Sequence, residues 1–345
     1  MSGPTSPNES TRAQAGATAG QEPHPGAGLV KKVLTGTLLG VLVFAALSVY
    51  GDARQLAGHL ARYDFSAFLA GLALATANYA LRFLRWQYYL GRLAIRVPVG
   101  ASLRIFVAGF VMSISPGKVG EVLKSALLAE QFDISAAKTA PIVVAERLTD
   151  LFALVLLVAI GARTFEEGTP IAIGGGVVVA CLWLVCSWPW LADRLIRLST
   201  VVPFFARIEP RLREAFDALR TVVGPGPLAF ATVLATFSWF LECLCLRLIA
   251  GGFEGVDLDV HAATFAYSAP TILGALALLP GGLFVTEAGM TGILQSVGGP
   301  AMTATVATGT TLLTRLATLW WAVALGLVAL ILQRRVVATH VGSET

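Results

Sequence analysis

Long runs of hydrophobic residues, separated by short polar stretches, dominate this chain. Four of these runs contain no Asp, Glu, Lys or Arg and cover 33–51, 168–192, 221–241 and 262–286. Each is close to the roughly 20 apolar residues that an α-helix needs to cross about 30 Å of hydrocarbon. Repeated runs of this length predict an all-α fold, a polytopic bundle of membrane helices.

Two kinds of apolar segment are predicted. The segments 101–130 and 262–297 each contain a Pro-Gly pair near the middle, which predicts a half-helix, a break and a second half-helix. The continuous segments predict six full spans, at 31–51, 66–90, 139–162, 169–190, 227–250 and 303–332. The order of span, broken segment and span therefore occurs twice, over 66–162 and again over 227–332.

The placement of Lys and Arg indicates how the broken segments run, because these residues gather in short cytoplasmic loops. If both segments are re-entrant hairpins, the basic loops face the cytoplasm, including Lys124, Lys138 and the arginine-rich stretch 191–220. If both segments crossed fully, 191–220 would lie outside, against the usual bias. We therefore expect six spans plus two re-entrant hairpins, with both termini cytoplasmic.

The two units also carry matching polar residues. In each unit a carboxylate precedes an arginine, by 26 residues in the first and 28 in the second. The counterparts are Glu121 with Glu287, Arg147 with Arg315, and Asn78 with Glu242. Three crossings separate the units, which predicts an inverted repeat whose broken helices meet near the midplane, as in many transporters.

The first break, SPGKVGEVLK at 115–124, places Pro116 and Gly117 at predicted membrane depth. The half-helix that follows has free amides and a positive dipole end that suit an anion, and Lys118 adds a cation. Backbone without partners is tolerated at this depth only inside protein or beside a wet cavity. A plain kink capped by Glu121 is the competing interpretation.

The second break, LLPGG at 278–282, contains Pro280, Gly281 and Gly282 and is followed by Glu287. Arg315 falls near the centre of the last predicted span, so Glu287 and Arg315 are candidates to neutralise each other. Arginine suits a phosphate ligand because its planar fork makes bidentate hydrogen bonds.

The span 139–162 carries Glu146, Arg147 and Asp150 near its centre, where each charge costs ~2.5–3.5 kcal/mol. Glu146 and Asp150 share a helix face and Arg147 lies three residues from Asp150, which predicts a network facing the bundle interior. A substrate or proton pathway and a structural ion pair that locks helices together both stay open.

Asn78, Arg82, Arg85 and Trp86 share one face of the span 66–90. Asn78 lies deepest, and Asn78 and Arg82 are pathway candidates. Arg85 and Trp86 lie near the cytoplasmic end, where we expect them to snorkel and anchor the helix. The alternation of apolar residues with Arg over 191–220 predicts an amphipathic helix on the inner leaflet.

Composition supports a membrane protein, since 56% of residues are hydrophobic and only 13% are charged, against about 25% in soluble chains. Residues 1–28, rich in Gly, Ala, Pro, Ser and Thr, predict a disordered tail. The membrane domain is expected over 29–335, followed by a short tail at 336–345. The net charge of +4 sits in loops, so it indicates topology rather than nucleic-acid binding.

The sequence lacks G-x-S-x-G, H-E-x-x-H, P-loop and dinucleotide-binding motifs, and its four cysteines show no ligand spacing. We therefore expect no cofactor, no metal and no catalytic residue, which argues against an enzyme. An intramembrane transferase that uses carboxylates alone stays open.

Four motifs, NYALRFLRW at 78–86, SPGKVGE at 115–121, ERLTD at 146–150 and PGGLFVTE at 280–287, resemble the flippase-like transmembrane domain of lysylphosphatidylglycerol synthases. That domain also exists as stand-alone membrane proteins, and the similarity covers nearly all of 30–335. The resemblance implies a bacterial inner-membrane protein that moves, or helps move, a polar-headed lipid between leaflets. Carried over by motif, the implied pathway positions are Asn78, Arg82, Pro116, Gly117, Glu121, Glu146, Arg147, Asp150, Pro280, Gly281, Glu287 and Arg315.

Two departures from the family pattern matter. The chain ends thirteen residues after Leu332, so we expect no soluble aminoacyl-transferring domain and no lysyl transfer. Phe284 stands where the family usually has a small Gly, and we expect it to narrow the second break.

The leading hypothesis is a lipid flippase whose substrate head group binds at the two breaks, held by amides and by Arg147 or Arg315. Glu121, Glu146 and Glu287 would gate the path or exchange protons. The rival hypothesis is a membrane partner that transports nothing and presents lipid to a separate glycosyl- or aminoacyl-transferase. Membrane lipids are the expected partners in both.

Overall fold

The computed structural model describes residues 52–114, 122–165, 168–187, 209–277 and 279–341. Every regular element within those ranges is a helix, which confirms the expected all-α class for the described part of the chain. The predictions for 1–28, for the first span and for most of 191–220 fall outside the described residues. So do those for Pro116, Gly117, Lys118 and Glu121.

The first half of the chain contains two long helices with a broken segment between them. Asp64 caps the first of these, α4, by accepting a hydrogen bond from the amide of Ser66 at 2.9 Å. The elements are α3 (Ala53–Leu60), α4 (Phe65–Arg92), α5 (Val99–Ala108), the 3-10 helix η1 (Gly109–Ile114), α6 (Leu123–Phe132), α7 (Ala136–Gly161), the 3-10 turn η3 (Ala162–Thr164) and α8 (Gly168–Ser187).

The second half repeats this order. Pro225 begins α12 at a position where its missing amide hydrogen costs nothing, and the side chains of Asp259 and Thr303 cap α13 and α15. The elements are α11 (Glu209–Val223), α12 (Pro225–Gly251), α13 (Val260–Leu276), the 3-10 turn η4 (Pro280–Gly282), α14 (Val285–Val297), α15 (Ala304–Arg315), the π-helical turn η5 (Leu316–Trp320) and α16 (Trp321–Val341).

Three helices among the described residues are long and apolar enough to cross a membrane: Phe65–Arg92, Pro225–Gly251 and the continuous helix Ala304–Leu332. They coincide with the predicted spans 66–90, 227–250 and 303–332. The total of six spans stays a prediction.

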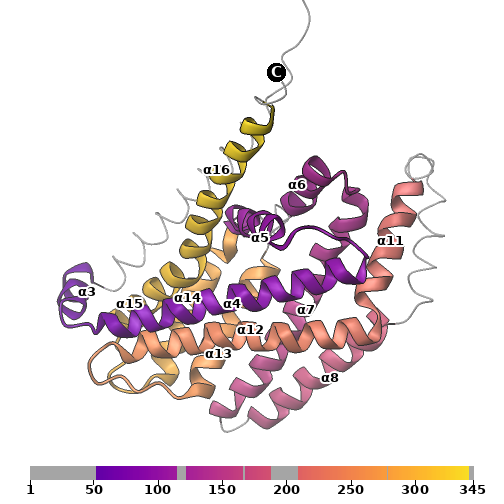
Figure 1. Ribbon diagram of the computed structural model, residues 1–345. Coiled ribbons are helices and arrows are strands. Elements are labelled where there is room, and N and C mark those ends of the chain that lie inside the picture. Colours follow the sequence, from indigo (N-terminus) through magenta and orange to yellow (C-terminus); the bar gives the residue numbers. More distant parts are fainter. Residues whose placement is uncertain (1–51, 115–121, 166–167, 188–208, 278, 342–345) are drawn as a thin grey trace, which may run out of the picture.

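The counterpart helices α4 and α12 lie side by side and run in opposite directions (Figure 1). Near one end of the pair, Gly71 lies so close to α12 that an added Cβ would be 2.9 Å from Cγ1 of Ile249. Farther along, Asn78 contacts Glu242 and Ser238. The two helices that the sequence predicts to be counterparts therefore form one central pair.

The broken segment 262–297 doubles back on itself. The hydroxyl of Thr286 on α14 donates to the carbonyl oxygen of Pro270 on α13 at 3.4 Å. An added Cβ on Gly274 would lie 3.1 Å from Cα of Gly282, and one on Gly289 would lie 3.0 Å from Pro270. Residues later in the segment contact residues earlier in α13, so the two half-helices run antiparallel. They form a hairpin, which is the shape that the Pro-Gly break predicts.

The second break lies against the described end of the first broken segment. An added Cβ on Gly281 would be 3.7 Å from Cα of Ile114, the last described residue before 115–121. Ile114 also packs with Leu283, Leu319 and Val323 in a small apolar cluster. The two interrupted segments of the chain, about 170 residues apart in sequence, thus meet in space.

Candidate functional site

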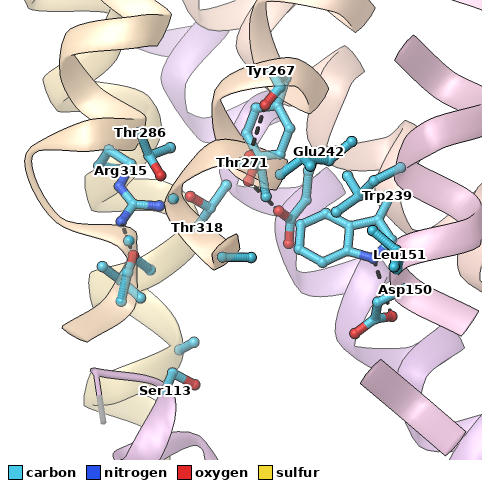
Figure 2. Close-up of a pocket in the computed structure, with 18 of the residues that line it drawn as sticks. Ser113, Asp150, Leu151, Trp239, Glu242, Tyr267, Thr271, Thr286, Arg315 and Thr318 are labelled. Atoms are coloured by element: carbon cyan, nitrogen blue, oxygen red, sulfur yellow. Dashed lines mark hydrogen bonds between the residues drawn. The ribbon is translucent and has the colours of Figure 1, made fainter. Parts of the chain in front are cut away.

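A cavity of about 310 Å³ opens where the central helices meet the second break. Figure 2 shows Arg315 and Ser113 on one side of it, Asp150 and Trp239 on the other, and Glu242 and Tyr267 between them. Its polar lining consists of Tyr79, Arg82, Ser113, Arg147, Asp150, Trp239, Glu242, Tyr267, Thr271, Thr286, Arg315 and Thr318. These residues come from both halves of the chain.

Arg315 ties the second break to the last span. Its Nε donates to Oε1 of Glu287 at 2.6 Å, and its Nη2 donates to the carbonyl oxygen of Gly281 at 2.6 Å. The predicted mutual neutralisation of Glu287 and Arg315 is therefore confirmed. Arg315 is also the last residue before the π-helical turn η5, a type of helix defect that is frequent at functional sites.

Asp150 is the centre of the charge network on α7. Its Oδ1 lies 2.8 Å from Nη1 of Arg85 and accepts from Nε1 of Trp239 at 3.1 Å, while its Oδ2 lies 3.0 Å from Nη2 of Arg147. The predicted contact between Arg147 and Asp150 is confirmed. The expectation that Arg85 snorkels to the interface is wrong, because the side chain is only 1% exposed and a carboxylate on another helix neutralises it.

Glu146 belongs to a separate pair. Its Oε2 lies 2.6 Å from Nζ of Lys124, and that ammonium stands 4.7 Å from the centre of the Trp86 ring. The expectation that Lys124 faces the cytoplasm is wrong, since its side chain is 4% exposed and enclosed by α4, α5 and α7. Trp86 is likewise buried and donates from Nε1 to the hydroxyl of Ser102, so it does not anchor the helix at an interface.

Glu242 presents a buried carboxylate to the cavity from the middle of α12. One oxygen accepts a hydrogen bond from the side-chain amide of Asn78 and the other accepts one from the hydroxyl of Tyr267. The carbonyl oxygen of the Asn78 side chain accepts in turn from Ser238. Asn78 and Glu242, which the sequence matches only as counterparts, are therefore direct partners.

The structure separates the predicted site residues into those that line the cavity and those that support it. Seven described ones line it: Arg82, Arg147, Asp150, Glu242, Gly281, Gly282 and Arg315. Asn78, Glu146 and Glu287 are buried, and Asn78 and Glu287 each bond to a residue that lines the cavity. Pro280 begins the turn η4 and lies outside the lining.

Sequence reasoning missed the aromatic and hydroxyl lining. Tyr267 and Trp239 contact the two cavity carboxylates, and the hydroxyl of Tyr79 donates to the carbonyl oxygen of Thr318 at 2.7 Å. A hydroxyl or indole in the middle of an apolar run was the available signal, since such groups usually find a partner when buried.

Phe284, which we expect to narrow the second break, takes no part in the cavity beside that break. Its side chain is 44% exposed and is not part of the cavity wall. Its backbone, however, has φ +72° and ψ −56°, a left-handed conformation that suits glycine and strains other residues. The glycine that the resemblance implies at this position would fit this backbone without strain.

Relatives of the chain are membrane proteins. Residues 34–326 match the family described as "Lysylphosphatidylglycerol synthase TM region". A UPF0104 membrane protein of Methanothermobacter thermautotrophicus is 23% identical over 84% of this chain and 90% of its own length. A UPF0104 membrane protein of Methanocaldococcus jannaschii is 26% identical over 54% of this chain and 79% of its own length.

Proposed function

The chain belongs to the lysylphosphatidylglycerol synthase TM region family, and on that premise we propose that it is a lipid translocator. It moves a lipid with a polar, phosphate-bearing head group between the two leaflets of its membrane. In this proposal the membrane is the inner membrane of a bacterium, and both termini are cytoplasmic.

The observation that carries the proposal is the convergence of three arginines, Arg82, Arg147 and Arg315, on one cavity beside the second break. Charged side chains inside a membrane bundle are costly, and they persist where they pair with one another or face a water-filled path. A guanidinium also matches the geometry of a phosphate group. The lipid's phosphate would bind among these arginines while its acyl chains remain in the bilayer.

An inverted repeat of six spans and two re-entrant hairpins is part of the proposal. The antiparallel pairing of α4 with α12, the doubling back of α13 onto α14 and the contact of Gly281 with Ile114 support it. In transporters built this way, one repeat rocks against the other around a site near the midplane. The cavity lies between the two units and would open to either leaflet in turn.

The carboxylates divide into two roles in this scheme. Glu146 and Glu287 hold Lys124 and Arg315 at 2.6 Å, which favours fixing the cations over exchanging protons. Asp150 and Glu242 line the cavity and would contact the substrate or water. Gating and proton exchange are thus assigned to the cavity carboxylates rather than to the buried pairs.

The test uses purified protein in vesicles that carry a trace of a fluorescent anionic lipid, with a membrane-impermeant reductant outside. Without transport, only the lipid of the outer leaflet is bleached; the protein should allow bleaching of both leaflets. Arg147→Gln should slow this transport by about tenfold or more, since a hydrogen bond to a charged group contributes about 1.5–3 kcal/mol. Arg96→Gln, in the exposed loop after α4, is the matched control and should transport normally.

The rival function predicts a different pattern. A partner that only presents lipid would leave the inner leaflet protected, and would raise the rate of a co-purified transferase instead. An intramembrane transferase would release a modified lipid from vesicles that contain no other protein. Either result, without bleaching of the inner leaflet, would overturn the translocator proposal.

A further inference from the structure

Three threonines form a row along one face of α15 that leads to the cavity. Thr305, Thr308 and Thr311 recur every three residues, and Arg315 follows four residues later, which places all four on one side of the helix. All four are buried. Arg315 lines the cavity, so the inner end of this threonine row reaches the candidate site.

The outer end of the row reaches the surface of the bundle. The hydroxyl of Thr305 donates to Oε1 of the exposed Gln55 on α3 at 3.5 Å. Figure 1 shows α3 beside the start of α15, where the two helices pack together. Thr305 and Arg315 are ten residues apart, or about 15 Å along the helix axis. That length is about half of the roughly 30 Å of hydrocarbon in a bilayer.

Helix α14 adds polar groups to the same seam. Thr291 on α14 donates from its hydroxyl to the hydroxyl oxygen of Thr311 at 2.9 Å. One turn nearer the cavity, Oε1 of Glu287 accepts from Nε of Arg315 at 2.6 Å. Polar side chains therefore face each other across α14 and α15 on two successive turns.

Several of the buried polar atoms along α15 have no hydrogen-bond partner among the described residues. A threonine inside a helix can donate to the carbonyl oxygen four residues earlier, as Thr318 does with Thr314 at 2.8 Å. The hydroxyls of Thr308, Thr310 and Thr314 make no such bond, and Oε2 of Glu287 also lacks a partner. Thr310 and Thr314 lie on the neighbouring face, one and two turns before Thr318, which lines the cavity.

Bound water is the ligand that suits these atoms. Inside a membrane bundle, a polar group without a partner is costly, and no bulk solvent is at hand to satisfy it. A buried water needs two to four polar partners, and hydroxyls can both donate to it and accept from it. The carboxylate on this seam, Glu287, already holds Arg315 at 2.6 Å, so a metal cation gains less here than water does.

We propose that the threonine row holds a chain of bound water molecules that links the cavity to the surface of the bundle at α3. The chain is an aqueous half-channel through one half of the membrane. The inference rests on the proposed function for its role, which is to exchange water with a lipid head group as the group enters or leaves the cavity. The chain itself can be tested without lipid transport.

Radiolytic footprinting of the full protein in vesicles tests for the water. An X-ray pulse converts a bound water into a hydroxyl radical, which oxidises a thiol beside it. The thiol introduced by Thr308→Cys should be oxidised several times more than that of Ala263→Cys, the matched control. Ala263 is equally buried, in an apolar cluster near the start of α13. Thr305→Cys repeats the test at the outer end, and the unmodified protein gives the background from its own cysteines.

Oxidation of both row variants only to the level of Ala263→Cys would overturn the proposal. It would mean that the seam between α14 and α15 is dry and that its hydroxyls only hold the two helices together.

A pair of substitutions at one position tests the water by stability. Thr308→Val keeps the shape of the side chain and removes the hydroxyl, whereas Thr308→Ser keeps the hydroxyl and removes the methyl group. If water binds the hydroxyl, Thr308→Val deprives it of a partner and should unfold at a lower temperature than Thr308→Ser. If the hydroxyl is dry, Thr308→Val removes an unpartnered polar group and unfolds at the higher temperature, which would contradict the chain.

The outcomes separate this inference from the proposed function. Strong oxidation of the row variants in a protein that moves no lipid would support the water chain and overturn the translocator. Lipid movement by a protein whose row variants react no more than Ala263→Cys would support the translocator and overturn the water chain.

Discussion

Arg315 and Arg147, which the sequence matches as counterparts in the two halves of the chain, have different surroundings. Arg315 is 8% exposed and bonds to both Glu287 and the carbonyl oxygen of Gly281. Arg147 is 28% exposed and meets an oxygen of Asp150, a carboxylate that also binds the fully buried Arg85. In the second half one arginine both fixes the break and faces the cavity. In the first half Arg85 fixes the carboxylate, and Arg147 is more available to a ligand.

The comparison predicts that neutralising Asp150, the central carboxylate of the first half, lowers the stability of the protein more than any other substitution considered below. Asp150→Asn removes the carboxylate that lies 2.8 Å from the buried Arg85, and removing one partner of a buried pair costs about 3–5 kcal/mol. Thermal unfolding in detergent measures the change. The control is Asp257→Asn in the exposed pair with Arg247, 3.9 Å apart, which should cost less than about 1 kcal/mol. Similar losses for the two variants would contradict the central role of Asp150.

In the second half, Glu287→Gln should destabilise the protein by about 2–3 kcal/mol, since the lost bond joins two charged groups. The expected loss is smaller than that of Asp150→Asn because Arg315 keeps the carbonyl oxygen of Gly281. The same unfolding experiment ranks the two variants. A larger loss for Glu287→Gln would reverse the comparison and make the second pair the main structural anchor.

Arg147→Gln should destabilise the protein by only about 1 kcal/mol, because Asp150 keeps Arg85 and Trp239 as partners. Transport should nevertheless fall strongly, as argued above. Unfolding and transport measured on one preparation test the separation of roles. A loss of stability as large as that of Asp150→Asn would show that Arg147 is structural.

The smallest effect concerns the backbone of the second break. Phe284→Gly should be about 1 kcal/mol more stable than Phe284→Ala, because only glycine relieves the strain at φ +72°. Both variants remove the exposed ring, so their difference isolates the added Cβ. Equal unfolding temperatures would mean that the backbone of the break relaxes when the ring is removed.

Local spacing was enough to predict several parts of the site. Arg147 and Asp150 lie three residues apart on one helix, so their contact follows from helical geometry. The Pro-Gly-Gly sequence at 280–282 predicts an interrupted helix, and the return of α14 along α13 follows the break. Glu287 follows the second break and Arg315 falls near the centre of the last predicted span, so the sequence makes them candidates to neutralise each other.

Tertiary packing decided the rest. Arg85 lies near a predicted span end, where local rules favour snorkelling, and the positive-inside rule places Lys124 on the cytoplasmic side. Carboxylates on α7 instead neutralise both side chains inside the bundle. Tyr267 and Trp239 look like core residues in their apolar runs. Tyr267 reaches Glu242 because α13 packs against α12, and Trp239 reaches Asp150 because α12 packs against α7.

The most direct test of the central claim is an experimental structure of the full protein with a phosphodiester lipid bound. We predict the phosphate inside the cavity, within hydrogen-bonding distance of at least two of Arg82, Arg147 and Arg315, with the acyl chains extending into the bilayer. A head group bound on the outer surface of the bundle, with the three arginines contacting only protein and water, would contradict the account.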